Sequence, residues 1–468
     1  MSVSVVLFTG DLRLHDHPPL RAALAGADEV VPLFVVDSGI RAAGFGTPNR
    51  LAFLADCLAD LDGRLRERGG RLVVRGGAVA REVRRVVGET GAGCVHLSAG
   101  SSRYARRREE NLRGALAGTG CALEVHDAVT TVLAPGAVTP TGRGRDHFAV
   151  FTPYLRRWTA AGARTPLAAP RSVPVPAGVR GGEVPSRARV AGVSPGLAAG
   201  GESEARRRFS RWSARRLDSY AELGDDLAAD ATSRLSPHLH FGCLSPAEVV
   251  HRARRRGGAG ADAFVRQLAW RDFHHQVLAA RPDAAVRDYR PRGDRWHTDE
   301  REVAAWREGR TGFPVVDAAM RQLRHEGWMP GRGRLLAAGF LAKTLYANWR
   351  VGAAHFLDLL VDGDIAANQL NWQWVAGTGN DTRPGRVLNP LSQARRFDPR
   401  GDYVRRWVPE LAGIEGAAVH TPWTLPAPER ARTGYPAPIV DPADTASRFR
   451  RGRGPDRTGP NGPSGGDA

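Results

Sequence analysis

Two aspartates, two asparagines and two tryptophans lie within residues 362–374, whose sequence is DGDIAANQLNWQW. This mixture suits a protein core poorly, because buried carboxylates need partners and buried indole N–H groups need acceptors. Asp362 and Asp364 are two residues apart and cannot share one face of a straight helix, so a turn there would direct both at a polar ligand. The alternative is structural: both aspartates could cap the next helix, and Trp372 and Trp374 could be packing aromatics.

A second polar run, TSRLS at residues 232–236, offers hydroxyls and backbone N–H groups at an expected helix start. An anion such as a diphosphate is favoured at that end of a helix. Ordinary N-capping explains the same residue types, and the run by itself favours that simpler interpretation.

The first 130 residues alternate apolar runs with amphipathic stretches. Strands are expected at residues 3–9, 29–37, 71–75, 94–98 and 123–126, and the clearest helices at residues 50–68 and 103–116. This alternation predicts an α/β domain with a doubly wound, Rossmann-like parallel sheet. Gly10, Asp11 and Leu12 follow the first strand where a GxGxxG motif would stand, so we do not place a dinucleotide in this domain.

Beyond residue 130 the composition changes twice. Residues 131–200 are rich in Pro, Gly, Ala and Arg with little periodicity, as expected of an interdomain connector. Helical patterns dominate residues 201–445, for example at residues 204–223, 261–279, 300–308 and 335–348, which predicts an all-α domain. The Gly- and Pro-rich tail at residues 446–468 is expected to be disordered.

Length, charge and cysteine content limit the kind of protein that this chain can be. A length of 468 residues favours two domains, and no apolar run approaches the length of a membrane span, so a protein outside the membrane is expected. The formal charge of +18 favours polyanions, yet Lys343 is the only lysine in an Arg-rich chain, which points equally to a biased genome. The four cysteines form no CxxC pair, so neither a zinc site nor disulfides are expected, and a reducing cytoplasm is the expected location.

Several long segments occur in a fixed order along the chain. They are VVLFTGDLRLHDHPPL (5–20), TSRLSPHLHFG (232–242), LAWRDF (268–273), GFPVVDAAMRQL (312–323), GWMPGRGR (327–334), the run at 362–374, and RRFDPRGDYVRRWVPEL (395–411). Together they resemble the cryptochrome/DNA photolyase family, and are most similar to its bacterial FAD-dependent deoxyribodipyrimidine photolyases. Ordered long motifs are far more specific than one short pattern.

The resemblance implies an FAD site in the helical domain. It would be lined by Tyr220, Thr232, Ser233, Arg234, Leu235, Ser236, Arg334, Asp362, Gly363, Asp364 and Asn368. Arg334 would pair with Asp362, and Asn368 would face the reactive flavin nitrogen, where an amide can donate or accept. The family also implies a second, light-harvesting pigment in the first domain, either a deazaflavin or methenyltetrahydrofolate, with the cleft at the carboxyl ends of the strands as its expected place.

The same resemblance assigns tryptophans to electron transfer and to DNA. Trp372, Trp349 and Trp296 match the chain that passes electrons from the surface to photoexcited flavin. The lesion-contacting residues would be Gln267, Trp270, Arg271, Gly331, Arg332 and Trp374. A dimerised pyrimidine pair stacks poorly in the duplex, so flipping it out costs less free energy than flipping out normal bases. Aromatic side chains can then hold the flipped-out pair by stacking.

The implied activity is light-driven repair of cyclobutane pyrimidine dimers in damaged DNA. Light excites fully reduced FAD, an electron passes to the flipped-out dimer, the ring opens and the electron returns. A monomer is the family expectation, and no metal is expected, because His238 and His240 lack a third ligand at a suitable spacing.

The chain departs from the family pattern mainly near the substrate. Gln267 stands where dimer-repairing members commonly have Glu, Gly331 replaces a common Asn, and Gly224 replaces a basic residue. Glutamine at this position also occurs in six-four photolyases and animal-type cryptochromes, so the alternatives are a six-four photolyase and a blue-light sensor. The short tail favours repair over signalling, and the missing glycine motif argues against a dark, nicotinamide-dependent flavin oxidoreductase.

Overall fold

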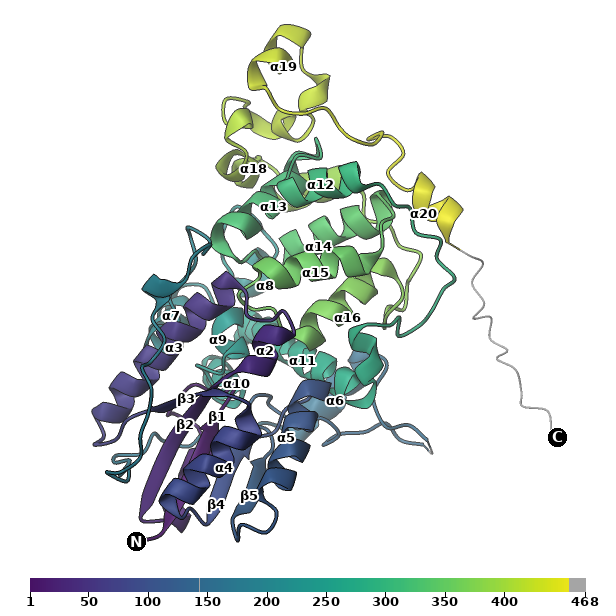
Figure 1. The fold of residues 1–468 in the computed structure, drawn as a ribbon. Coiled ribbons are helices and arrows are strands. Elements are labelled where there is room, and N and C mark those ends of the chain that lie inside the picture. The colour runs from purple at the N-terminus through teal and green to yellow at the C-terminus, as the bar shows by residue number, and fades with distance from the viewer. Residues whose placement is uncertain (143, 454–468) are drawn as a thin grey trace, which may run out of the picture.

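A five-stranded parallel sheet and a larger helical domain make up the computed structural model, which describes residues 1–142 and 144–453 (Figure 1). The sheet order is β3-β2-β1-β4-β5, and every neighbouring pair is parallel. The strands are β1 (Val3–Phe8), β2 (Glu29–Asp37), β3 (Val73–Gly77), β4 (Cys94–Ser98) and β5 (Ala122–His126). The predicted strands are all present, with bounds that agree within two residues.

Helices cover both faces of the sheet, as the doubly wound prediction requires. They are α1 (Pro18–Gly26), α2 (Ser38–Ala42), α3 (Pro48–Arg66), α4 (Val79–Thr90) and α5 (Arg103–Leu116). Successive β1 residues point to opposite faces. Val5 and Leu7 join a core with residues of α4 and α5, whereas Val6 and Phe8 join a core with residues of α1 and α3.

The connector contains a helix that the sequence analysis did not predict. Helix α6 (Phe151–Ala161) buries Phe151, Tyr154 and Trp158, which lie along one helical face. The helix has only eleven residues and lies in a Pro- and Gly-rich segment, so its amphipathic period is hard to recognise in the sequence. A short 3₁₀ turn, η1 (Arg187–Arg189), follows, and the chain around this turn runs beside α3 (Figure 1).

Residues 201–445 form a helical domain, as predicted, and one further helix lies in residues 446–453. The helices are α7 (Glu202–Arg215), α8 (Tyr220–Leu223), α9 (Ser236–His240), α10 (Pro246–Arg256), α11 (Gly258–Ala280), α12 (Glu300–Glu308), α13 (Pro314–Glu326), α14 (Gly331–Gly339), α15 (Trp349–Leu359), α16 (Ile365–Ala376), α17 (Pro390–Phe397), α18 (Asp402–Trp407), α19 (Ala427–Thr433) and α20 (Ser447–Gly452). Short turns are η2 (Pro282–Ala285), η4 (Pro409–Leu411), η5 (Gly416–His420), η6 (Pro422–Thr424) and the π-helical η3 (Phe340–Thr344).

Three predicted segments need correction. The helix expected at residues 204–223 is two helices, α7 and α8, separated at residues 216–219. The helix expected at residues 335–348 begins at Gly331, ends in η3, and does not reach residue 348. The tail is not disordered from residue 446, because α20 buries Phe449 and brings Gly452 against the ring of Tyr346. Residues 454–468 of that predicted tail lie outside the described residues.

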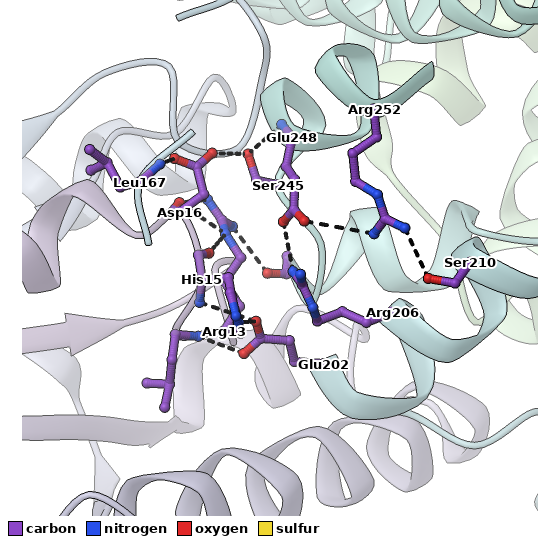
Figure 2. A network of polar contacts seen from close by, with 12 residues as sticks. Arg13, His15, Asp16, Leu167, Glu202, Arg206, Ser210, Ser245, Glu248 and Arg252 are labelled. Atoms are coloured by element: carbon purple, nitrogen blue, oxygen red, sulfur yellow. Dashed lines mark hydrogen bonds and ion pairs between the residues drawn. The ribbon is translucent and has the colours of Figure 1, made fainter. Parts of the chain in front are cut away.

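A buried polar network fastens the loop after β1 to the rest of the molecule (Figure 2). The guanidinium of Arg13 donates to the carbonyls of Asp16, Val129 and Gly242 at 2.9–3.0 Å, so one side chain joins this loop to the segment after β5 and to the helical domain. Glu202 of α7 accepts from the Leu14 amide at 2.7 Å. Burial lowers the pKa of Arg13, a cost that these contacts offset.

The connector itself is anchored by the fully buried Asp272 of α11. One carboxylate oxygen accepts from the amides of Val132 and Leu133 and from Trp158 Nε1, at 2.9–3.0 Å. Asp272→Ala should lower the free energy of unfolding by about 3–5 kcal/mol, because three buried donors lose their acceptor. Urea unfolding followed by tryptophan fluorescence measures this, with the exposed Asp262→Ala on the same helix as control. Equal midpoints for the two variants would contradict the anchoring role.

None of the helices in the described ranges combines the length and the apolar character that a bilayer crossing requires.

Candidate functional site

The two aspartates of the DGD sequence occupy the turn between α15 and α16, as expected from their spacing. Asp362 pairs with Arg334 of α14, with Nη2 and Oδ2 2.7 Å apart, and its side chain is 2% exposed. Asp364 caps α16 by accepting from the Ala367 amide at 2.8 Å. The capping alternative therefore holds for Asp364, while Asp362 keeps one buried oxygen, Oδ1, with no partner in the described structure.

His275 of α11 is a member of this site that the sequence analysis missed. Its Nε2 lies 3.3 Å from Asp364 Oδ2. Burial opposes ionisation of Asp364, but the charge and hydrogen bond of His275 outweigh it and hold the pKa of that carboxyl well below its usual range. The site therefore contains two carboxylates with cationic or histidine partners, Asp362 with Arg334 and Asp364 with His275.

A second missed residue, Arg50, comes from the N-terminal domain. Its Nη1 donates to the carbonyls of Leu357 and Leu360, at 3.1 Å in the latter case, and lies beside Gly363. A Cβ atom at Gly363 would stand 2.7 Å from this nitrogen, so a larger residue there would displace the end of the Arg50 side chain. Burial lowers the pKa of Arg50 to about 10. Arg50 thus positions the aspartate turn from across the domain boundary, a contact between residues 307 or more apart that no local pattern reveals.

The TSRLS run forms the turn that leads into α9 at Ser236. Arg234 has φ +52°, which aims its side chain away to Asp230 and Glu326 and over the ring of Trp328. No side chain caps α9 at Leu235. The plain N-capping interpretation is therefore wrong for this helix, and Thr232 Oγ1 is buried without a partner in the described structure.

Tyr220, the first residue of α8, supports the same region with its ring. It packs edge-on against Trp212 and Phe264, with ring centroids 5.6 and 5.7 Å apart. Burial, with the charge of Asp225, raises the pKa of Tyr220 to about 12, so the phenol stays protonated. Ser236 Oγ accepts from Trp328 Nε1 at 3.0 Å, and Ser233 Oγ accepts weakly from the Leu235 amide at 3.4 Å.

Asn368 and Trp372 lie one helical turn apart on α16. Asn368 Nδ2 donates to the carbonyl of Ala353 at 3.1 Å, which leaves Oδ1 as the end of the amide able to face a ligand. Trp372 is 2% exposed, and its Nε1 has no partner among the described residues. Its ring lies against Gly352 of α15, where an added Cβ would come within 2.1 Å of it.

The three predicted electron-transfer tryptophans come from α16, from the start of α15 and from the segment before α12. Trp372 packs over Gly352, and Trp349 begins α15 with its Nε1 donating to Asp288 Oδ1 at 2.8 Å. Trp296 is half-buried, and its ring lies 4.9 Å from that of Tyr346. Ring contacts in the described structure do not join any two of the three tryptophans, so the electron route stays a prediction.

Helix α11 presents the predicted substrate residues at helical spacing. Gln267 is exposed, and Trp270 and Arg271 follow three and four residues later, on the same face. Phe151 of the connector covers one face of Trp270, with ring centroids 3.6 Å apart and planes 8° from parallel. Arg271 Nη1 donates to the Thr130 carbonyl at 2.6 Å. Only the other face of Trp270 is left for a base.

The remaining predicted DNA residues lie on α14 and α16. Gly331 opens α14, and a Cβ added there would meet nothing within 4 Å, so the missing Asn leaves space. Arg332 pairs with Asp225 and stacks 4.0 Å over the ring of Phe397, so its charge is partly used within the protein. Trp374 is half-buried against the core of the helical domain.

Buried histidines around the site predict a loss of stability in mild acid. Burial lowers the pKa of His238 to about 3 and those of His240 and His274 to about 4. Below an unfolded pKa of 6.5 the unfolded chain binds protons that the folded chain excludes, so this stability is present above pH 6.5 and is lost as pH falls toward 4. The loss is up to about 1.4 kcal/mol per histidine for each pH unit.

Urea unfolding at several pH values between 7.5 and 5 tests this expectation. His274→Asn should flatten the dependence, while His297→Gln, at an exposed position, should leave it unchanged. A stability that does not change over this range would contradict the prediction. His238 also packs on Phe53 of α3, with ring centroids 5.1 Å apart, as expected of a core residue.

The residues present fit a flavin dinucleotide. Thr232 Oγ1, Asp362 Oδ1 and Trp372 Nε1 are all buried polar atoms that lack partners in the described structure, and such atoms are costly unless a ligand or water satisfies them. Donors and acceptors of these kinds match the diphosphate, ribose hydroxyls and ring nitrogens of FAD. Arg334 comes from α14, Asp362 and Asp364 from the turn between α15 and α16, and Asn368 from α16.

Comparisons with known proteins agree with this arrangement. Residues 4–174 match the family described as DNA photolyase, and residues 264–452 match that described as FAD binding domain of DNA photolyase. A deoxyribodipyrimidine photo-lyase of Streptomyces griseus is 65% identical over 456 residues, which are 97% of this chain and all of that protein.

Solved structures show the same fold over nearly the whole chain. A bacterial class III photolyase from Agrobacterium tumefaciens superposes with a TM-score of 0.88 at 32% identity, covering 96% of each chain. An archaeal photolyase from Sulfolobus tokodaii, solved with two FAD molecules, gives 0.81 at 30% identity, covering 96% of this chain and all of that one. The chain therefore belongs to the cryptochrome/DNA photolyase family, with an FAD-binding domain formed by its C-terminal helices.

Proposed function

We propose that this chain is a deoxyribodipyrimidine photolyase, which repairs cyclobutane pyrimidine dimers in damaged DNA with blue light. The 65% identity to a deoxyribodipyrimidine photo-lyase along its entire length is the observation that carries the proposal. The site agrees with it, because the flavin-side residues and the predicted lesion-side residues lie on the packed helices α11, α14 and α16.

Bound FAD, once fully reduced and excited by light, supplies the electron that opens the dimer. The chain's own residues position and protect that reaction. Arg334 and His275 hold the carboxylates of Asp362 and Asp364 in place as acceptors, and Asn368 presents its amide oxygen beside them. Trp270, supported by Phe151, offers one flat face to the extruded pyrimidines. Trp296, Trp349 and Trp372 serve to return the flavin to its reduced state.

The finer assignments extend the proposal. A second pigment, either a deazaflavin or methenyltetrahydrofolate, would bind at the carboxyl ends of the strands, where α/β folds place their ligands. The Sulfolobus relative, described as implying a novel light-harvesting cofactor, supports a second pigment in the family. We also infer that the chain is a monomer and that it works in the cytoplasm. The cytoplasmic location agrees with the free thiols of Cys57 and Cys243, whose sulfurs lie 3.3 Å apart.

A repair assay tests the function directly. An oligonucleotide with one cyclobutane thymine dimer is incubated with chemically reduced protein under blue light, with a dark control and a six-four lesion in parallel. Restoration of the cyclobutane substrate only in light supports the proposal. Repair of the six-four lesion alone would show that the chain is a six-four photolyase. Failure on both lesions by flavin-loaded, photoreducible protein would favour a blue-light sensor.

Gln267 sets an expected difference within this assay. Gln267→Glu should raise the quantum yield on the cyclobutane dimer by roughly two- to fivefold, because a carboxyl group can donate a proton to the dimer radical anion and an amide cannot. The control is Gln393→Glu on α17. If Gln267→Glu raises the quantum yield on the six-four lesion and not on the cyclobutane dimer, the expected gain from a proton donor is wrong, and glutamine already suits the cyclobutane substrate.

A further inference from the structure

Four side chains with metal-ligating atoms gather on the outer two strands of the sheet. Cys94 and His96 are two residues apart on β4, and Glu124 and His126 are two residues apart on β5. Alternate residues of a strand share a face. The parallel register pairs His96 with Glu124, so all four side chains project from the same face of the sheet.

The distances between these atoms match one coordination sphere. His96 Nδ1 lies 3.2 Å from Glu124 Oε2 and 3.1 Å from His126 Nε2, and the last two atoms are 3.8 Å apart. Metal bonds of about 2.0–2.3 Å in tetrahedral geometry place neighbouring ligands about 3.3–3.6 Å apart. The ligand atoms of Cys94, His96 and Glu124 lie within 4.8 Å of one another, whereas the Cys94 thiol and His126 are farther apart, so the Cys94 side chain must turn toward His126 to complete the set of four.

We propose that Cys94, His96, Glu124 and His126 bind one divalent transition-metal ion, with Zn²⁺ as the best fit. Imidazole nitrogens, a thiolate and one carboxylate form a borderline-soft ligand set that suits zinc and disfavours Mg²⁺ or Ca²⁺. The ion would clamp β5 to β4 at the sheet edge. The prediction that the chain binds no metal rested on the lack of CxxC and histidine motifs. The ligands proposed here are a C-x-H pair and an E-x-H pair on two different strands, and only the strand register brings the two pairs together.

The state of the side chains agrees with this site. His96 is 4% exposed, and its ring is held beside Glu124 and His126. Two imidazole nitrogens 3.1 Å apart, both close to one carboxylate oxygen, converge on a single point. The Glu124 side chain is 56% exposed, so an ion can enter from solvent.

A second group with similar residue types carries no such proposal. His297, Asp299 and Glu302 also lie close together, but their carboxylates already have partners. Asp299 caps α12 by accepting from the Arg301 amide at 2.9 Å, and Glu302 makes a two-pronged ion pair with Arg448. Those contacts explain the second group without an ion.

Zinc binding by the full-length, flavin-loaded protein, freed of any histidine tag, tests the inference. Competition with a chromophoric chelator should show one equivalent bound. Glu124→Gln and His126→Gln should each weaken binding at least tenfold, and the double variant should lose stoichiometric binding. Matched controls are Cys121→Ser, a neighbouring thiol, and His297→Gln, an exposed histidine of the second group; both should bind as the wild type does.

Cobalt(II) in place of zinc reports the geometry. The wild type should show the intense visible bands of a tetrahedral site and a sulfur-to-cobalt charge-transfer band, and Cys94→Ser should remove the latter. Far-UV circular dichroism and flavin content verify folding, and Glu124→Gln, at a largely exposed side chain, keeps the test informative if other variants fail to fold. Absence of stoichiometric zinc in the wild type, or unchanged affinity in Glu124→Gln, would overturn the proposal.

Discussion

Trp372→Phe should abolish photoreduction of the bound flavin by an external donor, with a loss of about a hundredfold or more in rate, while leaving repair by chemically reduced protein intact. Trp372 is the buried tryptophan one turn from Asn368, and its ring fills the space over Gly352. Phenylalanine keeps most of this packing but is far harder to oxidise, and every 1.4 kcal/mol added to the barrier costs a factor of ten. Absorbance of the flavin during illumination measures the rate.

Trp306→Phe is the matched control for this variant. Trp306 is fully buried, contacts the Trp372 ring at 6.0 Å between centroids, and donates to the Ala337 carbonyl at 2.9 Å. It should lose stability but keep photoreduction, because it is no part of the proposed route. Wild-type photoreduction in Trp372→Phe would refute the role of that tryptophan and leave the repair function untouched.

Asp362→Asn should cost the protein its flavin. The substitution keeps size and one carbonyl oxygen, but it removes the charge that Arg334 meets at 2.7 Å and leaves that guanidinium facing a neutral amide. Losing a largely buried, charge-assisted pair should raise the Kd for FAD at least tenfold, which corresponds to about 1.4 kcal/mol. Flavin released during gel filtration and fluorescence titration of the apoprotein measure the change.

Asp358→Asn is the control, since it removes the same charge from an exposed position of α15 near Arg50. It should retain FAD fully. If both variants lose flavin alike, the effect would belong to the net charge around the aspartate turn, and the specific pairing of Asp362 with Arg334 would be wrong.

Local sequence patterns predicted most of the fold. The apolar runs of β1 to β5 are short and bounded by polar or glycine residues, and α5 and α12 carry clear amphipathic periods, so their bounds were expected closely. Helix α6 was missed because Pro153 and nearby glycines obscured eleven residues of helix. Helix α20 was not predicted because Phe449 is buried against the segment around Tyr346. That segment is distant in the sequence, so no local pattern shows the contact.

The site divides in the same way. The DGD turn and its pair with Arg334 were expected from the spacing and from the family resemblance. The contacts of Arg50, His275 and Phe151 were not, because each crosses from one part of the chain to another more than 80 residues away. A single sequence carries no signal of such pairings, and the same is true of the strand register that joins His96 to Glu124.

The buried guanidinium of Arg13 also has an optical consequence. By holding the loop after β1 to carbonyls in the segment after β5 and in the helical domain, it fixes the carboxyl edge of the sheet relative to the helices. Two chromophores bound on either side of that boundary would keep one separation and one relative orientation of their transition dipoles. Excitation would then pass between them with a single efficiency across the population, and the donor's fluorescence would decay with one lifetime.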